Sequence, residues 1–329
     1  MAWTADDLVA AVRRRAQLPS ASEDGAINDA DILLLADEEL SLRLVPLVRS
    51  VRGDYWVRSE DVPVVSGTAS YRVPERSQTS GLRDVTVVDS GGVVYPIPQI
   101  SVEEAWRWQQ PTSGIVGSMQ NAAFYMDGTN VVIVPTPSDS SWSLRLRYYR
   151  AMSALVPNDQ CGLVIDAFID PPGAYGGEMI QILTLPSGWQ QLANYPAQPL
   201  DLVYSGPPFG VPHMDITPLD VVVAPDYLIE VTSIAALGLV PAPAYGLYYL
   251  CKASQTCVVD LPRECWALLV SAVAARVLDL IGDREAAQLE YALYEREAQN
   301  VTLLLTPRVE GNPIRIVDRN SLLRSQRRW

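Results

Sequence analysis

The sequence predicts an α+β fold in which a discontinuous helical core carries inserted antiparallel β modules and an extended C-terminal tail. Apolar residues recur at steps of three and four near both ends of the chain, in residues 1–54 and 258–306. Between them the period falls to two, which is typical of strands, in a first β module over 55–156 and a proline-rich second module over 157–257. Residues 307–329 are too polar and arginine-rich to fold alone.

Two short amphipathic helices are predicted at the N-terminus. Thr4 with Asp7, and Asn28 with Asp31, have the spacing of an N-cap residue and an acid three positions later. Pro46 should kink the second helix or end its regular part, because proline lacks the N–H that the helix uses. Isolated helices of this length are marginal in water, so we expect both to pack on the C-terminal helical segment.

The C-terminal segment predicts one long helix from about Pro262 to about Asn300. At about 1.5 Å per residue this helix would span roughly 55–60 Å. Gly282-Asp283 is the expected bend, because glycine costs about 1 kcal/mol in a helix interior. The predicted buried stripe is Trp266, Leu269, Val270, Val273, Val277, Leu280 and Ile281, continued by Leu289, Tyr291, Leu293 and Tyr294.

The first module predicts strands, tight turns and one short helix. A first strand is predicted at 62–65, hairpins are predicted over 82–97 and 123–134, and residues 142–149 alternate as in a half-buried strand. Ser101 and Glu104 form a capping box that starts a helix bearing Trp106 and Trp108. The second module predicts strands at 163–169, 179–185, 200–204, 221–223, 227–232 and 247–252.

Composition places the chain among globular proteins. Of 329 residues, 48% are hydrophobic and 19% charged, and no apolar run reaches the roughly 18 residues of a membrane span. The N-terminus lacks the layout of a signal peptide. The four cysteines have no CxxC spacing, so we expect free structural thiols rather than a zinc site or a disulfide scaffold, and assembly in the cytosol. They are Cys161, Cys251, Cys257 and Cys265.

Charge is distributed unevenly along the chain. Residues 157–260 hold ten acids and a single base, Lys252, for a net charge of −9. Residues 308–329 hold six arginines against Glu310 and Asp318, for a net charge of +4. This asymmetry indicates distinct modules rather than one uniform surface.

No motif predicts catalysis or a cofactor. The only lysine is not in a phosphate-binding loop, and no zinc-protease, nucleophile-elbow or dinucleotide motif is present. The single histidine, His213, falls in a proline-rich stretch that we expect to be a loop, without a nucleophile motif nearby. We therefore predict a protein that is not an enzyme and that needs no cofactor or metal.

Paired carboxylates are the remaining enzymatic alternative. Asp166 with Asp170, and Asp226 with Glu230, could serve glycoside hydrolysis, or the same acids could bind Ca²⁺. The density of acids favours instead a solvated acidic edge that discourages sheet-to-sheet association. Trp106 and Trp108 could form a platform for a sugar or base, but neighbouring helix positions do not share a face. We expect one in the core and the other at an interface.

The tail is the predicted docking element. Apolar and arginine residues interleave there, which suits a segment that orders in a groove of a partner protein with tryptophan and arginine as anchors. The alternative is a disordered tail. The candidate docking residues are Ile314, Arg315, Ile316, Arg319, Leu322, Leu323, Arg324, Arg327, Arg328 and Trp329.

The order of these segments resembles the head-to-tail adaptor (connector) proteins of tailed bacteriophages, particularly short-tailed phages. The resemblance begins with the two N-terminal helices. It continues through GTASYRVP at 67–74, residues 82–97 and GTNVVIVPTPSDSSWSLRLRYYRAMSALV at 128–156. It ends with LPRECWALLVSAVAARVLDLIGD at 261–283 and the segments beyond. Smaller members of the family lack an equivalent of residues 157–257.

The resemblance implies a non-enzymatic virion protein at the head–tail junction, assembled in the host cytoplasm. Such adaptors form a dodecameric ring under the portal protein, with the helical core around a DNA channel and the C-terminal segment reaching the portal. The β modules face outward or toward the downstream tail protein, a nozzle or hub. Viral DNA would pass without sequence-specific binding, which an excess of acids suits, and no membrane is involved. The alternatives are a phage-associated cell-wall glycosidase and a carbohydrate-binding virion module.

Overall fold

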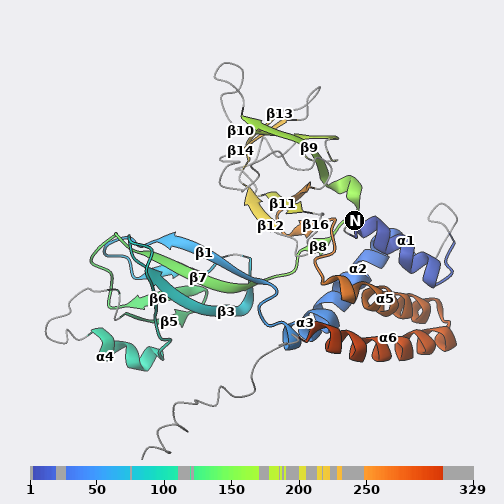
Figure 1. Cartoon of the computed structure of the whole chain (residues 1–329), viewed down its shortest axis with the longest axis horizontal. Helices are drawn as coiled ribbons and strands as arrows, with labels where there is room; N and C mark the ends of the chain where they lie inside the picture. Colours follow the sequence, from blue (N-terminus) through green and yellow to red (C-terminus); the bar gives the residue numbers. More distant parts are fainter. Residues whose placement is uncertain are drawn as a thin grey trace, which may run out of the picture.

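The computed structural model has helices and antiparallel sheets arranged in three lobes (Figure 1). A helical lobe combines both ends of the described chain, and two β lobes contain the residues between them. No helix in the part of the chain that the structure describes is both long and apolar enough to cross a membrane. The structure describes residues 3–19, 27–74, 76–109, 119, 122–169, 178–184, 186, 189, 200–204, 213–216, 218–222, 228–231 and 248–306.

The N-terminal helices begin at their predicted caps. Helix α1 (Ala5–Arg15) starts after Thr4 and helix α2 (Asp29–Glu39) after Asn28, and both have complete capping boxes with Asp7 and Asp31. Helix α2 continues through a π-helical turn (η1, Leu40–Leu44) into α3 (Val45–Val51), whose first turn contains Pro46. The irregular turn directly before the proline fits the predicted disturbance, since its ring crowds the preceding turn.

The prediction of one long C-terminal helix is wrong, because the segment is a hairpin of two helices. Helix α5 (Trp266–Ile281) follows a 3₁₀ turn (η7, Arg263–Cys265), and helix α6 (Arg284–Leu305) returns beside α5 (Figure 1). Gly282 ends α5 with φ at 89°, a left-handed conformation that side chains oppose. Asp283 then caps α6 by accepting the N–H of Ala286 at 3.1 Å.

The helical lobe has one hydrophobic core built from both ends of the chain. Helix α5 packs on α1, α2 and α6, so that it lies at the centre of the bundle. Residues Leu8 and Ile32 from the N-terminal helices and Leu269 and Val273 from α5 are completely buried in the same core. Apolar burial is the main stabilising contribution to folding, so residues more than two hundred positions apart stabilise one lobe.

The hairpin changes which predicted stripe residues are buried. Trp266 is only half-buried and stacks on Trp3 with ring centroids 4.5 Å apart. Leu280, Ile281 and Leu289, which the single-helix prediction placed in the stripe, are exposed by 64%, 43% and 68%. They lie on both sides of the turn between α5 and α6, where Ala287 is buried in the bundle core but these three side chains are not.

The first β lobe packs two antiparallel sheets around a core that includes Val85, Leu144, Phe124 and Ile133. The predicted hairpins, β3–β4 and β5–β6, are both present. Most of β1 was not predicted, because it is a polar edge strand. The first sheet has β1 (Val57–Pro63), β7 (Ser143–Arg150), β3 (Ser77–Val88) and β4 (Val94–Pro96), and the second has β2 (Ser70–Arg72), β6 (Asn130–Val134) and β5 (Ala123–Asp127).

The second β lobe contains a seven-stranded antiparallel sheet among the described residues, in the order β12-β11-β15-β9-β10-β14-β13. His213 begins strand β12, so the prediction that it lies in a loop is wrong. A short parallel pair, β8 (Ala154–Leu155) with β16 (Gln255–Thr256), lies beside the helical lobe. The strands are β9 (Gly162–Ile169), β10 (Glu178–Ile182), β11 (Leu200–Tyr204), β12 (His213–Ile216), β13 (Pro218–Val222), β14 (Leu228–Val231) and β15 (Tyr248–Lys252).

Candidate functional site

The predicted carboxylate pairs are not assembled by the described residues. Asp170 and Asp226 lie outside them, so neither pair can be completed. Asp166 is on β9 and Glu230 is on β14, and strand β10 lies between these two strands. Glycoside hydrolysis needs two carboxyl groups on either side of one bond, and the described residues complete neither of the predicted pairs.

A buried cluster of charges joins the three lobes. Asp201, on β11 of the second β lobe, is completely buried and accepts hydrogen bonds from Arg76 and Arg150 of the first β lobe. Arg150 also lies 3.9 Å from Asp260, which precedes the helical hairpin. We call Arg76, Arg150, Asp201 and Asp260 the junction cluster. Its four members contribute two positive and two negative charges, and Arg58 adds a further positive charge near Arg150.

Burial dominates the electrostatics of the junction cluster. Only 6% of Arg150 is exposed, and desolvation lowers the pKa of its guanidinium while Asp201 and Asp260 oppose this shift. The Ser153 hydroxyl accepts a further hydrogen bond from Arg150 at 3.0 Å. A guanidinium with several donors in a fixed plane suits such a shared site. The cluster therefore fixes the contact between lobes and has no free reactive group for chemistry.

A second polar contact joins the helical lobe to the strand pair β8–β16. The carboxylate of Asp37, on α2, accepts the backbone N–H of Leu155 at 3.0 and 3.1 Å. Burial raises the pKa of this carboxyl from 3.8 to about 6, and the hydrogen bond only partly opposes the shift. Between these two pH values the folded protein holds a proton that the unfolded chain releases. The stabilisation from this proton is complete below about pH 3.8 and is lost as pH rises through about 6.

Replacing Asp37 should therefore have an effect that depends on pH. Asp37→Asn keeps an acceptor for Leu155 but cannot ionise, so we expect a higher melting temperature at about pH 7.5 and little change at about pH 4. Thermal unfolding of both proteins at the two pH values measures this. Glu103→Gln, which replaces an exposed acid, serves as the control. Its melting temperature should differ from that of the wild type by the same amount at both pH values. Equal melting curves for wild type and Asp37→Asn at about pH 7.5 would contradict the assignment.

The helical lobe exposes large apolar side chains on two sides. The α6 face consists of Leu289, Leu303 and Leu304, which are exposed by 68%, 71% and 61%. The α2 face consists of Leu34 on α2 and Leu42 on η1, exposed by 61% and 71%. Helices α2 and α6 both pack on the central helix α5. Large exposed apolar side chains are candidates for a surface that binds another protein.

Comparison with known families identifies the protein's class. The family model described as the SU10 adaptor protein matches residues 3–177, more than half of the 329 residues. The chain belongs to this family of bacteriophage adaptor proteins. The match includes the N-terminal helices and the first β lobe, whereas the helical hairpin lies beyond it. No curated protein matches the chain.

Membership of the family makes the adaptor a structural protein of the phage virion. The docking residues predicted in the tail, 314–329, all lie outside the described residues, so their role stays a prediction. The two exposed helix faces were not predicted from the sequence. The excess of leucine on α6 could have indicated the α6 face, but the prediction of a single long helix placed some of these leucines in the core.

The two tryptophans of the adaptor's short helix α4 (Ala105–Gln109) are both exposed, by 56% for Trp106 and 37% for Trp108. The prediction that one of them lies in the core is therefore wrong. Helix α4 follows a 3₁₀ turn (η2, Val102–Glu104) and is too short to bury both sides against the sheet. The guanidinium of Arg107 lies 5.5 Å from the centroid of the Trp106 ring, a cation–π distance.

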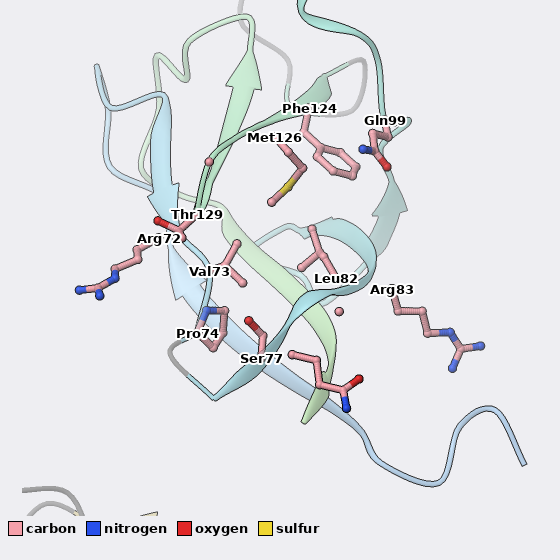
Figure 2. A pocket seen from close by; sticks show the side chains of 13 residues that line it. Arg72, Val73, Pro74, Ser77, Leu82, Arg83, Gln99, Phe124, Met126 and Thr129 are labelled. Atoms are coloured by element: carbon pink, nitrogen blue, oxygen red, sulfur yellow. The ribbon is translucent and has the colours of Figure 1, made fainter. Parts of the chain in front are cut away.

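A pocket of about 820 Å³ opens in the adaptor's first β lobe. Figure 2 shows Val73, Leu82, Phe124 and Met126 directed toward a common space, with the side chains of Arg72 and Arg83 pointing outward. Among the described residues that line it, none is an acid, histidine or cysteine. The pocket can thus accept an apolar group, and this described part of its lining offers no general base or metal ligand.

Three of the adaptor's cysteines converge, although Cys161 precedes Cys251 by 90 residues. The sulfur atoms of Cys161, Cys251 and Cys257 all lie within 4.8 Å of one another and are buried. All three are free thiols, as is Cys265 in the helical core. Among the cysteine, histidine and acidic side chains that the structure describes, these three thiols form the group that could hold a soft metal ion. Sequence spacing contains no signal for this cluster.

Proposed function

We propose that the protein is a head-to-tail adaptor that forms a ring beneath the portal protein and links it to the tail. The observation that carries this proposal is a helical lobe with a complete core that still exposes leucines on two sides. A protein that acted alone would gain nothing from these side chains in water. The family of phage adaptors supplies the context in which neighbouring copies cover them.

The positions of the two faces favour a head-to-tail contact between copies. An isologous contact uses one patch twice, whereas a heterologous contact joins two different patches and closes into a ring when the rotation between successive copies permits. Leu289 and Leu303 lie about 21 Å apart along α6, at nearly the same angle around the helix. The α6 face thus has an apolar side chain near each end of the helix, and we propose that this side of α6 packs on the α2 face of the next copy.

In this ring the helical lobes surround the channel through which viral DNA passes. The helical lobe is acidic, because residues 1–54 and 258–306 hold eighteen acids against ten arginines, and this excess suits a conduit since walls of like charge do not hold the DNA that must move past them. Viral DNA would pass through the channel without sequence-specific binding. The β lobes face outward or toward the downstream tail protein, a nozzle or hub, and Trp106 and Trp108 are exposed for such a contact. A ring of twelve copies follows from the resemblance to adaptors of short-tailed phages.

Residues 307–329 are proposed to dock on the portal. Their net charge would be attracted to an acidic or carbonyl-lined groove, and Trp329 and the arginines would act as anchors. The ring would be assembled in the host cytoplasm and retained in the virion at the head–tail junction. No observation favours a glycosidase or a carbohydrate-binding module, since the described residues complete neither carboxylate pair.

Deleting residues 314–329 should abolish binding to the portal while leaving the melting temperature nearly unchanged. Removing one hot-spot residue of an interface typically reduces the binding free energy by about 2 kcal/mol or more, and this deletion removes several candidate hot-spot residues together. Sedimentation of the protein with and without purified portal measures the effect. A variant with the same residues in scrambled order is the control that separates specific anchors from net charge. A truncated protein that still mounts on the portal, or that does not fold, would contradict the docking role.

A further inference from the structure

The sheet of the second β lobe has a narrow joint at its centre. Strands β9 and β15 connect its two halves, and their ladder consists of two pairs, Tyr249 with Leu163 and Leu250 with Gly162. The neighbouring ladders, β9–β10 and β11–β15, have five pairs each. Since ladder pairs hold strands together, the described part of this sheet is weakest where β9 meets β15.

The cysteines lie directly beside this joint. In an antiparallel ladder the partner numbers change in opposite directions, so one position beyond its last pair, Leu250–Gly162, the same register sets Cys251 opposite Cys161. The thiol of Cys251 donates to the sulfur of Cys161 at 2.9 Å, and both residues are at least 97% buried. Directly opposed residues of paired strands have Cα atoms about 4.5–5.5 Å apart, within the range that a disulfide spans.

We propose that Cys161 and Cys251 form a cross-strand disulfide once the virion has left the reducing host cytoplasm. The proposal rests on the virion location of the adaptor but not on its ring or its docking tail. Disulfides persist on virions outside the cell, whereas cytosolic thiols are kept reduced. The bond would close a loop of 90 residues, the separation of the two cysteines, across the narrow joint of the sheet.

The chemistry needs a low-molecular-weight disulfide as the oxidant. The thiolate of one cysteine attacks this oxidant, forms a mixed disulfide and releases one small thiol. The thiolate of the second cysteine then attacks the protein sulfur of the mixed disulfide and releases the other small thiol. The two cysteines together lose two protons and two electrons, and the oxidant is reduced to two thiols.

Local opening of the joint would give the oxidant access. While the joint is closed, the thiols are buried, and the hydrogen bond with Cys251 is the main cause that raises the pKa of the Cys161 thiol. Protonated thiols are poor nucleophiles. A ladder of two pairs is a site where local opening costs less than global unfolding. The reduced form is therefore stable during assembly and oxidises slowly afterwards.

The geometry favours a disulfide over a metal ion in this cluster. Structural zinc sites use four ligands, and the described residues contribute three here. Three buried thiolates around a metal would also leave a net negative charge, whereas a disulfide is neutral. Cys257 lies beside the first residue of α1, because its carbonyl accepts the N–H of Ala5 at 2.7 Å. Cys257 follows β16 and is not opposite another cysteine in the register of β9 and β15, so its thiol should remain free.

Intact mass and thermal unfolding of the full-length protein test this inference. After incubation with oxidised glutathione we expect a loss of about 2 Da and, in non-reducing peptide maps, a linked pair of peptides with Cys161 and Cys251. The melting temperature should rise by about 5 °C and return when a reductant is added. Cys161→Ala and Cys251→Ala should abolish both changes, whereas Cys257→Ala and the control Cys265→Ala should retain them.

Three results would overturn the proposal. One is wild-type protein that keeps its mass and melting temperature after oxidation, and this measurement does not depend on any variant folding. Another is a linked pair that includes Cys257 in place of Cys161 or Cys251. The third is stoichiometric zinc or copper in protein purified without chelators, lost together with the three thiols, which would make the cluster a metal site. None of these results depends on ring assembly, so the proposed function is tested separately.

Discussion

Asp201→Asn should lower the free energy of unfolding by about 3–5 kcal/mol, the usual cost of removing one member of a buried ion pair. Asparagine has nearly the same shape as aspartate, so packing is preserved and the charge alone is lost. Arg150, which is 6% exposed, would then remain buried without the Asp201 carboxylate of β11. Its remaining acidic partner in the junction cluster would be Asp260, at 3.9 Å. Because the cluster joins three lobes, the second β lobe should also separate from the others at lower urea concentration.

Urea unfolding followed by tryptophan fluorescence measures this loss. Asp61→Asn is the matched control, since Asp61 also pairs with an arginine, Arg145, through two contacts of 2.7 Å, but at the surface. That change should cost less than about 1 kcal/mol, because solvent screens exposed pairs. If both variants lost the same stability, the junction cluster would not be the contact that holds the lobes together.

Leu303→Glu should prevent ring formation on the portal without reducing the stability of the monomer. The side chain is 71% exposed on the α6 face, so the isolated protein tolerates the charge. In the ring the same position would be buried against the next copy, where burial of one leucine contributes about 1.5–3 kcal/mol and an unpaired carboxylate costs more. The penalty recurs at every interface of the ring, so even a modest value per contact eliminates the closed assembly.

Sedimentation and electron microscopy of portal complexes measure ring formation. Leu183→Glu, the same substitution at a 54% exposed leucine of the second β lobe, is the matched control and should form rings. Leu42→Glu, on the α2 face, should fail as Leu303→Glu does. A mixture of the two variants should yield pairs of copies but no rings, since one intact interface remains between them. If Leu303→Glu formed normal rings, the α6 face would not be a contact between copies.

Local sequence patterns determined the beginnings of the helices and the hairpins of the first β lobe. The capping boxes at Thr4, Asn28 and Ser101 depend on residues three positions apart, and all three are present. The glycine turn in residues 127–130 joins β5 to β6 in the same way. Such features need only neighbouring residues, because turn and cap hydrogen bonds close within a few positions.

Features that depend on distant partners were decided by the tertiary structure. Gly282 was identified as a bend, but the return of α6 along α5 depends on packing that a periodic stripe does not specify. The same stripe predicts a buried Leu289 in a straight helix and an exposed one in a hairpin. The tryptophans of α4 are exposed for a related reason, since the position of this helix beyond the sheet is not encoded by its own five residues.

The sequence by itself determined an α+β chain without a catalytic motif, with helical ends and inserted antiparallel strands. It could not place Asp201 beside Arg76 and Arg150, or Cys161 beside Cys251, because these pairs are separated by 125, 51 and 90 residues. Composition counts charges and thiols, but the energy of each depends on what surrounds it after folding. Only the folded structure, by removing these groups from water together, turned scattered residues into a junction between lobes and a cluster of thiols.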